Sequence, residues 1–514
     1  MAFAELPVED SDCTTIIRSG GGGGGGVRPQ QTTAGTIRQR LRRSRTRTGC
    51  LTCRLTRLLC SSRHLKCDEN KPLALRPSIL QISSKDKIEQ DEAAGASLAE
   101  DAVVYVRQYT EPEPPRWQEM EALRYYREFI LPLKEGEVMD RFGVLPPWNG
   151  PHGYMLLLDV ATHRILVACR TPGMLITAKD DPSIRGAWAA FSRQVAKLLA
   201  SVNKDLSDAT KSTYEKLETF QKIFHLTFYD LAVNPSALRQ HSSGYRALME
   251  HVGGARVLMR ETDLQFNFTQ FSMLIIVISN NTTCPANKLV RGFEEYTDED
   301  LTKLVNVLGE RNFHVPLPLF IAGNRLTELR RQVADGTCSS AGLTAAARDH
   351  FDAIGAFDAD KWARSTRFEV DSPASAFARI FQVAVRLYGI LSLPPSVVVS
   401  WALARSYPRL PRLSVYDSVL VSHRRKLLKK LYRYRGTFSN KRDMTWPLVV
   451  VGASLTGDGQ DEDRNFVAES LLDIWRNPLA RCSPVLCLEK LHIFWASGKK
   501  AWDDCFYEMT PCVA

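Results

Sequence analysis

Apolar residues recur at steps of three and four along the chain from Arg116 to its end, a spacing typical of amphipathic helices. Segment 117–133 carries the first clear stripe, and Pro132 is expected to close that helix. Its members are Met120, Leu123, Tyr126 and Ile130. Segment 244–259 carries a second stripe, made of Leu248, Val252, Ala255 and Met259. Segment 372–391 carries a third, ahead of Pro394 and Pro395, made of Phe377, Ile380, Ala384, Leu387 and Leu391. Period-two alternation is scarce, so the pattern predicts an all-α fold in which a large helical domain buries these stripes against one another.

The composition divides the chain into four parts. Residues 1–37 contain a run of seven glycines and are expected to be disordered, low-complexity sequence. Residues 38–72 form a basic, cysteine-containing head, residues 73–115 a polar and acidic linker, and residues 116–514 the helical domain. The linker has no sustained heptad repeat, which argues against dimerisation through a coiled coil.

No segment predicts export or membrane insertion. The amino terminus, MAFAELPVEDSD, is acidic and lacks the apolar run of a secretory signal. The longest uninterrupted apolar runs, such as 273–278 and 446–451, are too short to span a bilayer. We therefore expect no membrane partner.

The net charge of +10 is concentrated in one segment. Ten Lys or Arg residues and no Asp or Glu lie between Arg38 and Lys66, and without these ten the chain has 57 basic and 57 acidic residues. A local excess of this kind favours contact with nucleic acid over a generally basic protein, and it also fits a nuclear localisation signal.

Four of the twelve cysteines lie within this basic segment, at Cys50, Cys53, Cys60 and Cys67. Cys50 and Cys53 form a C-x2-C turn, which brings two thiolates to one metal ion, and further thiolates are close by in the sequence. This arrangement predicts zinc as the cofactor, with these cysteines as its ligands. The other eight cysteines have no framework spacing, which indicates buried free thiols in a reducing compartment.

The sequence GCLTCR followed by RHLKCDENKP resembles the DNA-binding head of the fungal zinc-cluster transcription factors, in which six cysteines hold two zinc ions. The resemblance implies a helix that enters the major groove and reads a G·C-rich, CGG-like half-site. On that helix would lie Arg54, Arg63, His64 and Lys66. Backbone phosphates would be contacted by Arg42, Arg43, Arg45 and Arg47. The resemblance therefore implies a nuclear, zinc-dependent, sequence-specific regulator of RNA polymerase II genes.

The head allows two alignments with the family spacing C-x2-C-x6-C. Cys60 satisfies the spacing as the sequence stands. If residues 55–61 are an insertion, Cys67 takes that place instead, and the basic residues 63–66 fall on the face of the helix that meets DNA. We prefer this second alignment, in which Cys60 is an extra thiol on an inserted loop.

The family's three further cysteines are missing after Pro72, and the next cysteine is Cys169. Four thiolates can enclose one zinc ion in a tetrahedron, but they cannot enclose two. This departure leaves an alternative open, in which the head is broken and the chain is a regulatory or interaction protein that does not bind DNA.

The helical region resembles the fungal-specific transcription factor domain of the second type, over about 115–510. The segments that carry the resemblance are EALRYYREFILPL, HVGGARVLM, DMTWPLVVVGASLTGDGQDEDR and LEKLHIFWASGKKAWDDCF. The resemblance implies an all-helical regulatory domain without catalytic residues, which acts through transcriptional co-regulators or a small ligand. The sequence also lacks a P-loop, a dinucleotide fingerprint and a nucleophile elbow, so we expect no enzyme.

Two further clusters invite a functional interpretation. The run RRKLLKKLYRYR, from Arg424 to Arg435, could be a partner or phosphate surface, but we interpret it as the solvated face of an amphipathic helix. Trp495, Trp502 and the pair Asp503 and Asp504 could form a site, but core aromatics and a capping acid explain them more simply.

Overall fold

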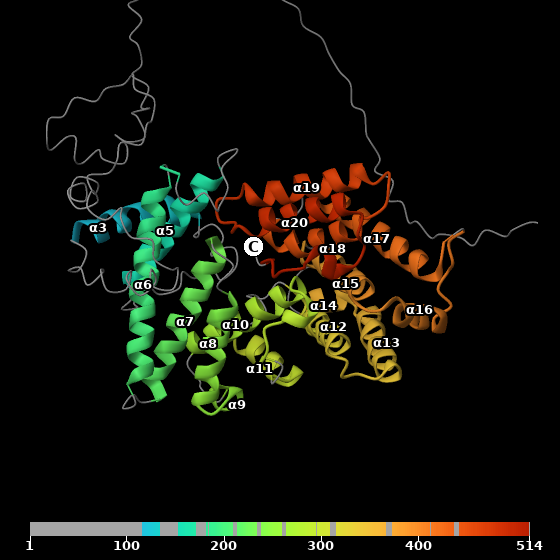
Figure 1. Ribbon diagram of the computed structural model, residues 1–514, viewed down its shortest axis with the longest axis horizontal. Helices are drawn as coiled ribbons and strands as arrows, with labels where there is room; N and C mark the ends of the chain where they lie inside the picture. The colour runs from blue at the N-terminus through green and yellow to red at the C-terminus, as the bar shows by residue number, and fades with distance from the viewer. Residues whose placement is uncertain are drawn as a thin grey trace, which may run out of the picture. The chain divides into compact units, whose positions relative to one another are not determined.

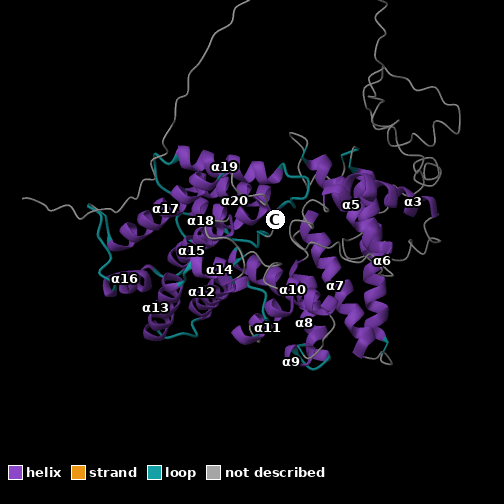
Figure 2. Cartoon of the chain, turned by 180° about the vertical axis from the view of Figure 1, so that it is seen from behind, coloured by secondary structure: helices purple, strands orange, loops and turns teal. Residues whose placement is uncertain are grey.

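A computed structural model describes twelve ranges of the chain: 116–133, 153–170, 181–182, 184–208, 213–233, 238–259, 264–293, 296–308, 315–365, 373–411, 413–435 and 441–512. All of them belong to one compact unit, Gln90–Ala514. The predicted low-complexity segment, head and linker lie outside the described residues. Every regular element in the described ranges is helical, which confirms the all-α prediction (Figure 2).

The first half of the helical region contains α3 (Arg116–Tyr125), η3 (Tyr126–Ile130), α5 (Gly153–Cys169), α6 (Arg185–Ser207), α7 (Thr213–Val233), α8 (Leu238–His251), α9 (Ala255–Leu258), α10 (Leu264–Thr282), η5 (Ala286–Lys288) and α11 (Asp298–Leu308). The second half contains α12 (Leu317–Asp335), α13 (Ser340–Ala356), α14 (Ala359–Ser365), α15 (Pro373–Ser392), α16 (Pro395–Ala404), α17 (Val415–Tyr434), η7 (Lys441–Met444), α18 (Thr445–Ala453), α19 (Asp461–Trp475), α20 (Ser483–Ser497) and α21 (Trp502–Cys505).

Two large hydrophobic clusters form the core. One is built by α5 to α11, where α5, α6 and α7 lie side by side, and the other by helices between α12 and α21, where α18, α19 and α20 do so (Figure 1). Val315, just ahead of α12, packs against both clusters. A third, small cluster joins α3 and η3 to α5. The two large clusters therefore meet near the start of α12, and also at Trp475 and Cys482, which belong to the first cluster although they follow α18 in the sequence.

Several helices begin at sequence signals that fix their first turn. The Ser339 hydroxyl accepts a hydrogen bond from the Gly342 amide at 3.2 Å and caps α13. The Ser414 hydroxyl accepts one from the Asp417 amide at 3.0 Å and caps α17. Pro395 opens α16, where its missing N–H would have no partner within the helix.

The apolar stripe predicted in segment 117–133 is half wrong. Tyr126 and Ile130 are buried as expected, but Met120 and Leu123 are 64% and 38% exposed, and Ala122 is buried instead. The buried face follows a spacing of four residues, from Ala122 to Tyr126 and Ile130, and the π-helical turn η3 begins at Tyr126, after the two exposed residues. Helical residues also continue through Pro132 to residue 133, one residue beyond the predicted stop.

The stripe predicted in segment 244–259 belongs to two helices. Gly253 and Gly254 have φ of +106° and +89°, a region that only glycine occupies readily, and they end α8 before α9 begins. Leu248 and Ala255 are still buried, one on each side of this break.

Helix α15 confirms the third predicted stripe in full, because all five of its members are buried. It contacts α12, α13, α14, α17, α18 and α21. By length and apolar composition, residues 374–392 would suffice to cross a membrane, contrary to the expectation from the sequence. Buried residues make up 72% of that window, so α15 has the surroundings of a core helix.

Helix α17 carries the basic run and has the amphipathic character that its sequence indicates. Leu427, Leu428 and Leu431 are buried, and most of the seven basic side chains are exposed. Its Arg424 donates to the Ser454 carbonyl at 3.0 Å, and Arg435 pairs with Glu469 at 3.2 Å. The interpretation as a solvated helix face is confirmed.

His423, on the buried face of α17, should make stability depend on pH. Its Nδ1 lies 2.9 Å from the Val419 carbonyl oxygen and 3.4 Å from the Tyr407 hydroxyl. Burial lowers its pKa to about 4, and the charges of Arg386 and Lys426 act in the same direction. The unfolded state therefore binds a proton below about pH 6.5, where the folded state does not, so stability is lost as the pH falls from 6.5 toward 4.

We expect the free energy of unfolding to drop by about 2 kcal/mol between pH 8 and pH 5 on account of His423. The variant His423→Gln should show a profile flatter by that amount in urea unfolding. At pH 8 both side chains are neutral, so the difference in the free energy of unfolding between the parent and the variant there measures the packing contribution alone. Parallel profiles for the two proteins would contradict this assignment.

Candidate functional site

The residues that the sequence assigns to metal and DNA lie outside the described ranges. They are Cys50, Cys53, Cys60 and Cys67 for zinc, and Arg42, Arg43, Arg45, Arg47, Arg54, Arg63, His64 and Lys66 for DNA. Within the described ranges, no group of three or more His, Cys, Asp or Glu side chains could hold a metal ion.

Seven of the scattered cysteines are described, and all seven are free thiols. Six are buried, and Cys338 is half-buried. Burial raises the pKa of Cys482 to about 12 and that of Cys169 to about 11, so these sulfurs stay protonated and unreactive at neutral pH. For these seven residues the prediction of free thiols is confirmed.

A cavity of about 140 Å³, half open to solvent, lies among α10, α12 and α15, near the junction of the two core clusters. Segments far apart in the sequence supply its wall. These are Ile275, Ile278, Ser279 and Thr282 from α10, Val315, Leu319, Phe320, Gly323 and Asn324 from α12 and the residues ahead of it, Phe381 and Val385 from α15, and Arg442, Asp443, Trp446 and Cys512. Most of this wall is aliphatic or aromatic.

The aromatic part of the wall is a stacked pair. The rings of Phe381 and Trp446 have centroids 5.4 Å apart and planes 25° apart. The Trp446 indole also donates to the Thr282 hydroxyl at 2.9 Å, which fixes the orientation of the ring. Together the two residues form an aromatic part of the wall whose indole N–H is already hydrogen-bonded.

Most polar groups of the cavity wall form hydrogen bonds with one another or with the backbone. The Thr282 hydroxyl donates to the Ser279 carbonyl at 2.6 Å, and the Cys512 thiol donates to the same oxygen at 3.1 Å. Arg442 donates to the Leu479 carbonyl at 3.1 Å. Burial lowers the pKa of Arg442, and the adjacent Asp443 carboxylate opposes that effect. Both signs of charge thus lie side by side at the wall.

The last turn of α10, next to this cavity, is capped by the guanidinium of Arg330, which is 2% exposed. Arg330 donates to the carbonyls of Thr282 at 3.1 Å and Asn281 at 3.3 Å, and also to that of Cys284. The final carbonyls of a helix lack partners within the helix and carry partial negative charge, so a cation there both pairs them and offsets the helix dipole.

Arg330 also connects α10, which belongs to the first core cluster, to the second core cluster. It donates to the Tyr388 hydroxyl at 3.2 Å and lies 3.8 Å from the Asp503 carboxylate. The Trp502 indole donates to the Thr282 carbonyl at 2.8 Å, the same oxygen that Arg330 contacts. Arg330 is thus a structural centre that joins α10, α12, α15 and α21.

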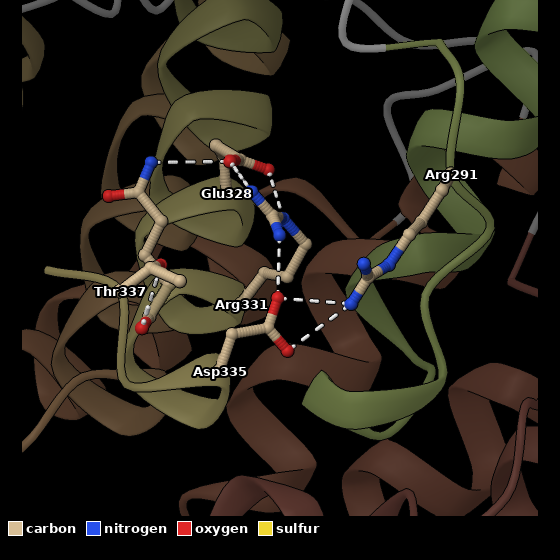
Figure 3. A network of polar contacts seen from close by, with 6 residues as sticks. Arg291, Glu328, Arg331, Asp335 and Thr337 are labelled. Carbon is tan, nitrogen blue, oxygen red and sulfur yellow. Dashed lines mark hydrogen bonds and ion pairs between the residues drawn. The ribbon is translucent and has the colours of Figure 1, made fainter.

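The next residue, Arg331, belongs to a different network, on the surface (Figure 3). Its guanidinium lies between Glu328 and Asp335, and it is 2.6 Å from the Asp335 carboxylate, which also binds Arg291 at 3.0 Å. Burial raises the pKa of Glu328, but the hydrogen bonds from Arg331 and Gln332 outweigh this effect and lower it overall. The network ties the segment after η5 to the end of α12 and indicates a structural role.

The tryptophans and acids near the carboxyl end also have structural roles. Trp502 is 2% exposed, and the Trp495 indole donates to the Gly452 carbonyl at 2.9 Å. Asp503 faces Arg330, and Asp504 pairs with Lys499 at 3.2 Å. The interpretation as a core aromatic is confirmed for Trp502, whereas Trp495 is partly buried at the edge of the core. The interpretation of a capping acid is wrong, because Ala501 is the N-cap of α21 and the two acids lie in its first turn.

Sequence reasoning missed the cavity and Arg330. One signal for Arg330 was present, because it lies four residues after Leu326 and eleven after Leu319, on the buried side of α12. A charged residue in register with an apolar stripe is an exception that requires a buried partner.

Comparison with known proteins gives one curated relative. The chain is 28% identical over 278 residues to the phomenoic acid biosynthesis cluster-specific transcriptional regulator of Leptosphaeria maculans. The match covers 53% of this chain and 50% of the length of that protein, so the chain spans about half of its relative. No protein-family model and no solved structure matches the chain. The relative's name is that of a regulator and not of an enzyme, in agreement with the expected absence of enzymatic activity.

Proposed function

We propose that this chain is a nuclear transcription regulator of a fungus, which binds DNA through residues 38–72 and is controlled through its helical region. The observation that carries the proposal is the position of the charge, because the whole net positive charge lies beside four clustered cysteines. The similarity to a cluster-specific transcriptional regulator supports the regulatory role. Transcriptional co-regulators would be the partners of the helical region.

The donor set of the head fits one zinc ion. Cys50, Cys53 and Cys67, with Cys60 as the fourth thiolate, have the ligand type and number of a closed tetrahedral site. When bound, zinc would fold the head, because small zinc modules depend on their metal for structure. We propose that basic residues after the knuckle then contact base edges and that the arginines before it contact phosphates.

The missing cysteines after Pro72 support a second candidate function. If the head holds no metal, the chain acts as an interaction protein through its helical region and does not bind DNA. Metal content therefore separates the two candidates.

We expect the purified full-length chain to carry one zinc ion in native mass spectrometry. Cys53→Ser should lose it, because three thiolates leave the tetrahedron open, while Cys13→Ser, which lies outside the cluster, should retain it. The zinc-loaded chain should shift a CGG-containing duplex in an electrophoretic assay, and a chelator should abolish the shift. Arg45→Ala should weaken binding to all DNA sequences by a similar factor. It should also reduce the slope of log K against log salt concentration by about one, because one phosphate contact is lost.

A chain without zinc that shifts no duplex would favour the interaction protein. Two zinc ions would contradict the ligand count, since four clustered thiolates cannot hold both.

A further inference from the structure

Gly323 lines the cavity from the interior of α12, where glycine is a poor helix former. Its surroundings do not require glycine. A Cβ atom there would meet only Val385, at 3.9 and 4.0 Å, which is ordinary van der Waals distance. By contrast, a Cβ at Gly389 of α15 would lie 2.7 Å from the Phe351 ring and 3.0 Å from Leu326. Packing explains the glycine at 389, whereas at 323 the missing side chain leaves space in the cavity.

We propose that this cavity is a binding site for a small, uncharged, ring-sized apolar molecule. Its volume of about 140 Å³ is close to that of the engineered apolar cavity of about 150 Å³ that binds benzene. The stacked Phe381 and Trp446 rings supply an aromatic part of the wall that a ring-sized molecule can contact. The site lies in the helical region alone, so the proposal holds whether or not the head binds DNA.

The wall selects against charged ligands. Its polar atoms at Thr282, Trp446 and Cys512 already have hydrogen-bond partners within the protein. Arg442 and Asp443 present opposite charges next to each other, so neither an anion nor a cation meets a wall of one sign. A charged molecule would lose its hydration here without a matching partner.

The site is placed where a ligand can influence the fold around it. Thr282 contributes its hydroxyl side to the cavity wall, and its carbonyl accepts hydrogen bonds from Arg330 and Trp502. A ligand seated against α10, α12 and α15 therefore stabilises the same helix junction that Arg330 holds together. Binding should raise the melting temperature, and the increase should grow with the logarithm of the free ligand concentration above the Kd.

The test uses the whole chain and two small molecules that contain the same benzene ring. Toluene is uncharged, and benzoate is an anion. Toluene is expected to raise the melting temperature by several degrees at saturation and to give a saturable binding isotherm by calorimetry, whereas benzoate at the same concentration does neither. Gly323→Leu places a side chain in the cavity and should weaken toluene binding at least tenfold. The matched control is Gly244→Leu, a glycine in α8 with nothing within 4 Å, which should bind toluene like the parent.

Circular dichroism of each variant establishes that it is folded. Should Gly323→Leu not fold, Gly323→Ala, which the contact distances allow, narrows the cavity and should still weaken toluene severalfold. The proposal is overturned if toluene does not bind the parent chain, if the folded Gly323 variants bind it unchanged, or if benzoate binds as well as toluene.

Discussion

Replacing Arg330 by methionine is expected to lower the free energy of unfolding by about 3–5 kcal/mol. The side chain is 2% exposed and donates to three backbone carbonyls and to the Tyr388 hydroxyl. Methionine fills a similar volume but donates no hydrogen bond, so the carbonyls of Asn281 and Cys284 would lose this buried donor, whereas the Thr282 carbonyl would keep the Trp502 indole. Urea unfolding at pH 7, followed by circular dichroism, measures the difference directly.

The neighbouring Arg331 provides the control for this experiment. Its partners are carboxylates at the surface, Glu328 and Asp335, and water can replace it there (Figure 3). Arg331→Met should therefore cost about 1 kcal/mol or less. Equal losses for the two variants would mean that Arg330 contributes through general charge effects on α12 and not as the cap of α10.

The helical fold could be predicted where burial is complete on one face and the backbone is regular. Helix α15 meets both conditions, and every residue of its predicted stripe is buried. The prediction failed at α3, where Met120 and Leu123 are exposed, because the buried face there follows Ala122, Tyr126 and Ile130 and several apolar positions in this segment leave more than one possible stripe. It failed again at Gly253 and Gly254, whose positive φ divides one apolar stripe between two helices.

The two kinds of candidate site differ in how far apart their residues are in the sequence. The four cysteines of the head are close neighbours, so their chemistry can be recognised without a structure. The cavity and the Arg330 centre join Thr282 to residues 48 and 220 positions away, Arg330 and Trp502. Such groups show no common spacing, because only the packing of whole helices brings them together.

Replacing Trp502 by alanine is expected to lower the free energy of unfolding by about 3–5 kcal/mol. The indole is 2% exposed and packs edge-on against Tyr388, with centroids 5.0 Å apart, and against Phe506 at 4.8 Å. Alanine would leave a cavity in the second core cluster and remove the hydrogen bond to the Thr282 carbonyl. Chemical unfolding of the variant gives the loss. Trp495→Ala should cost less, because Trp495 is only partly buried and packs at the margin of the same cluster.

The effects of Trp502 and Arg330 should not be additive, because both side chains donate to the Thr282 carbonyl. Trp502→Phe removes the indole N–H together with part of the ring, but Arg330 still donates to the Thr282 carbonyl in this single variant. In the double variant, which also carries Arg330→Met, the Thr282 carbonyl oxygen loses both donors and becomes a buried acceptor without a hydrogen bond. The double variant should then lose about 0.5–3 kcal/mol more than the sum of the two single variants. Strict additivity would show that the two donors act independently and that the Thr282 carbonyl is not the point at which α10, α12 and α21 are joined.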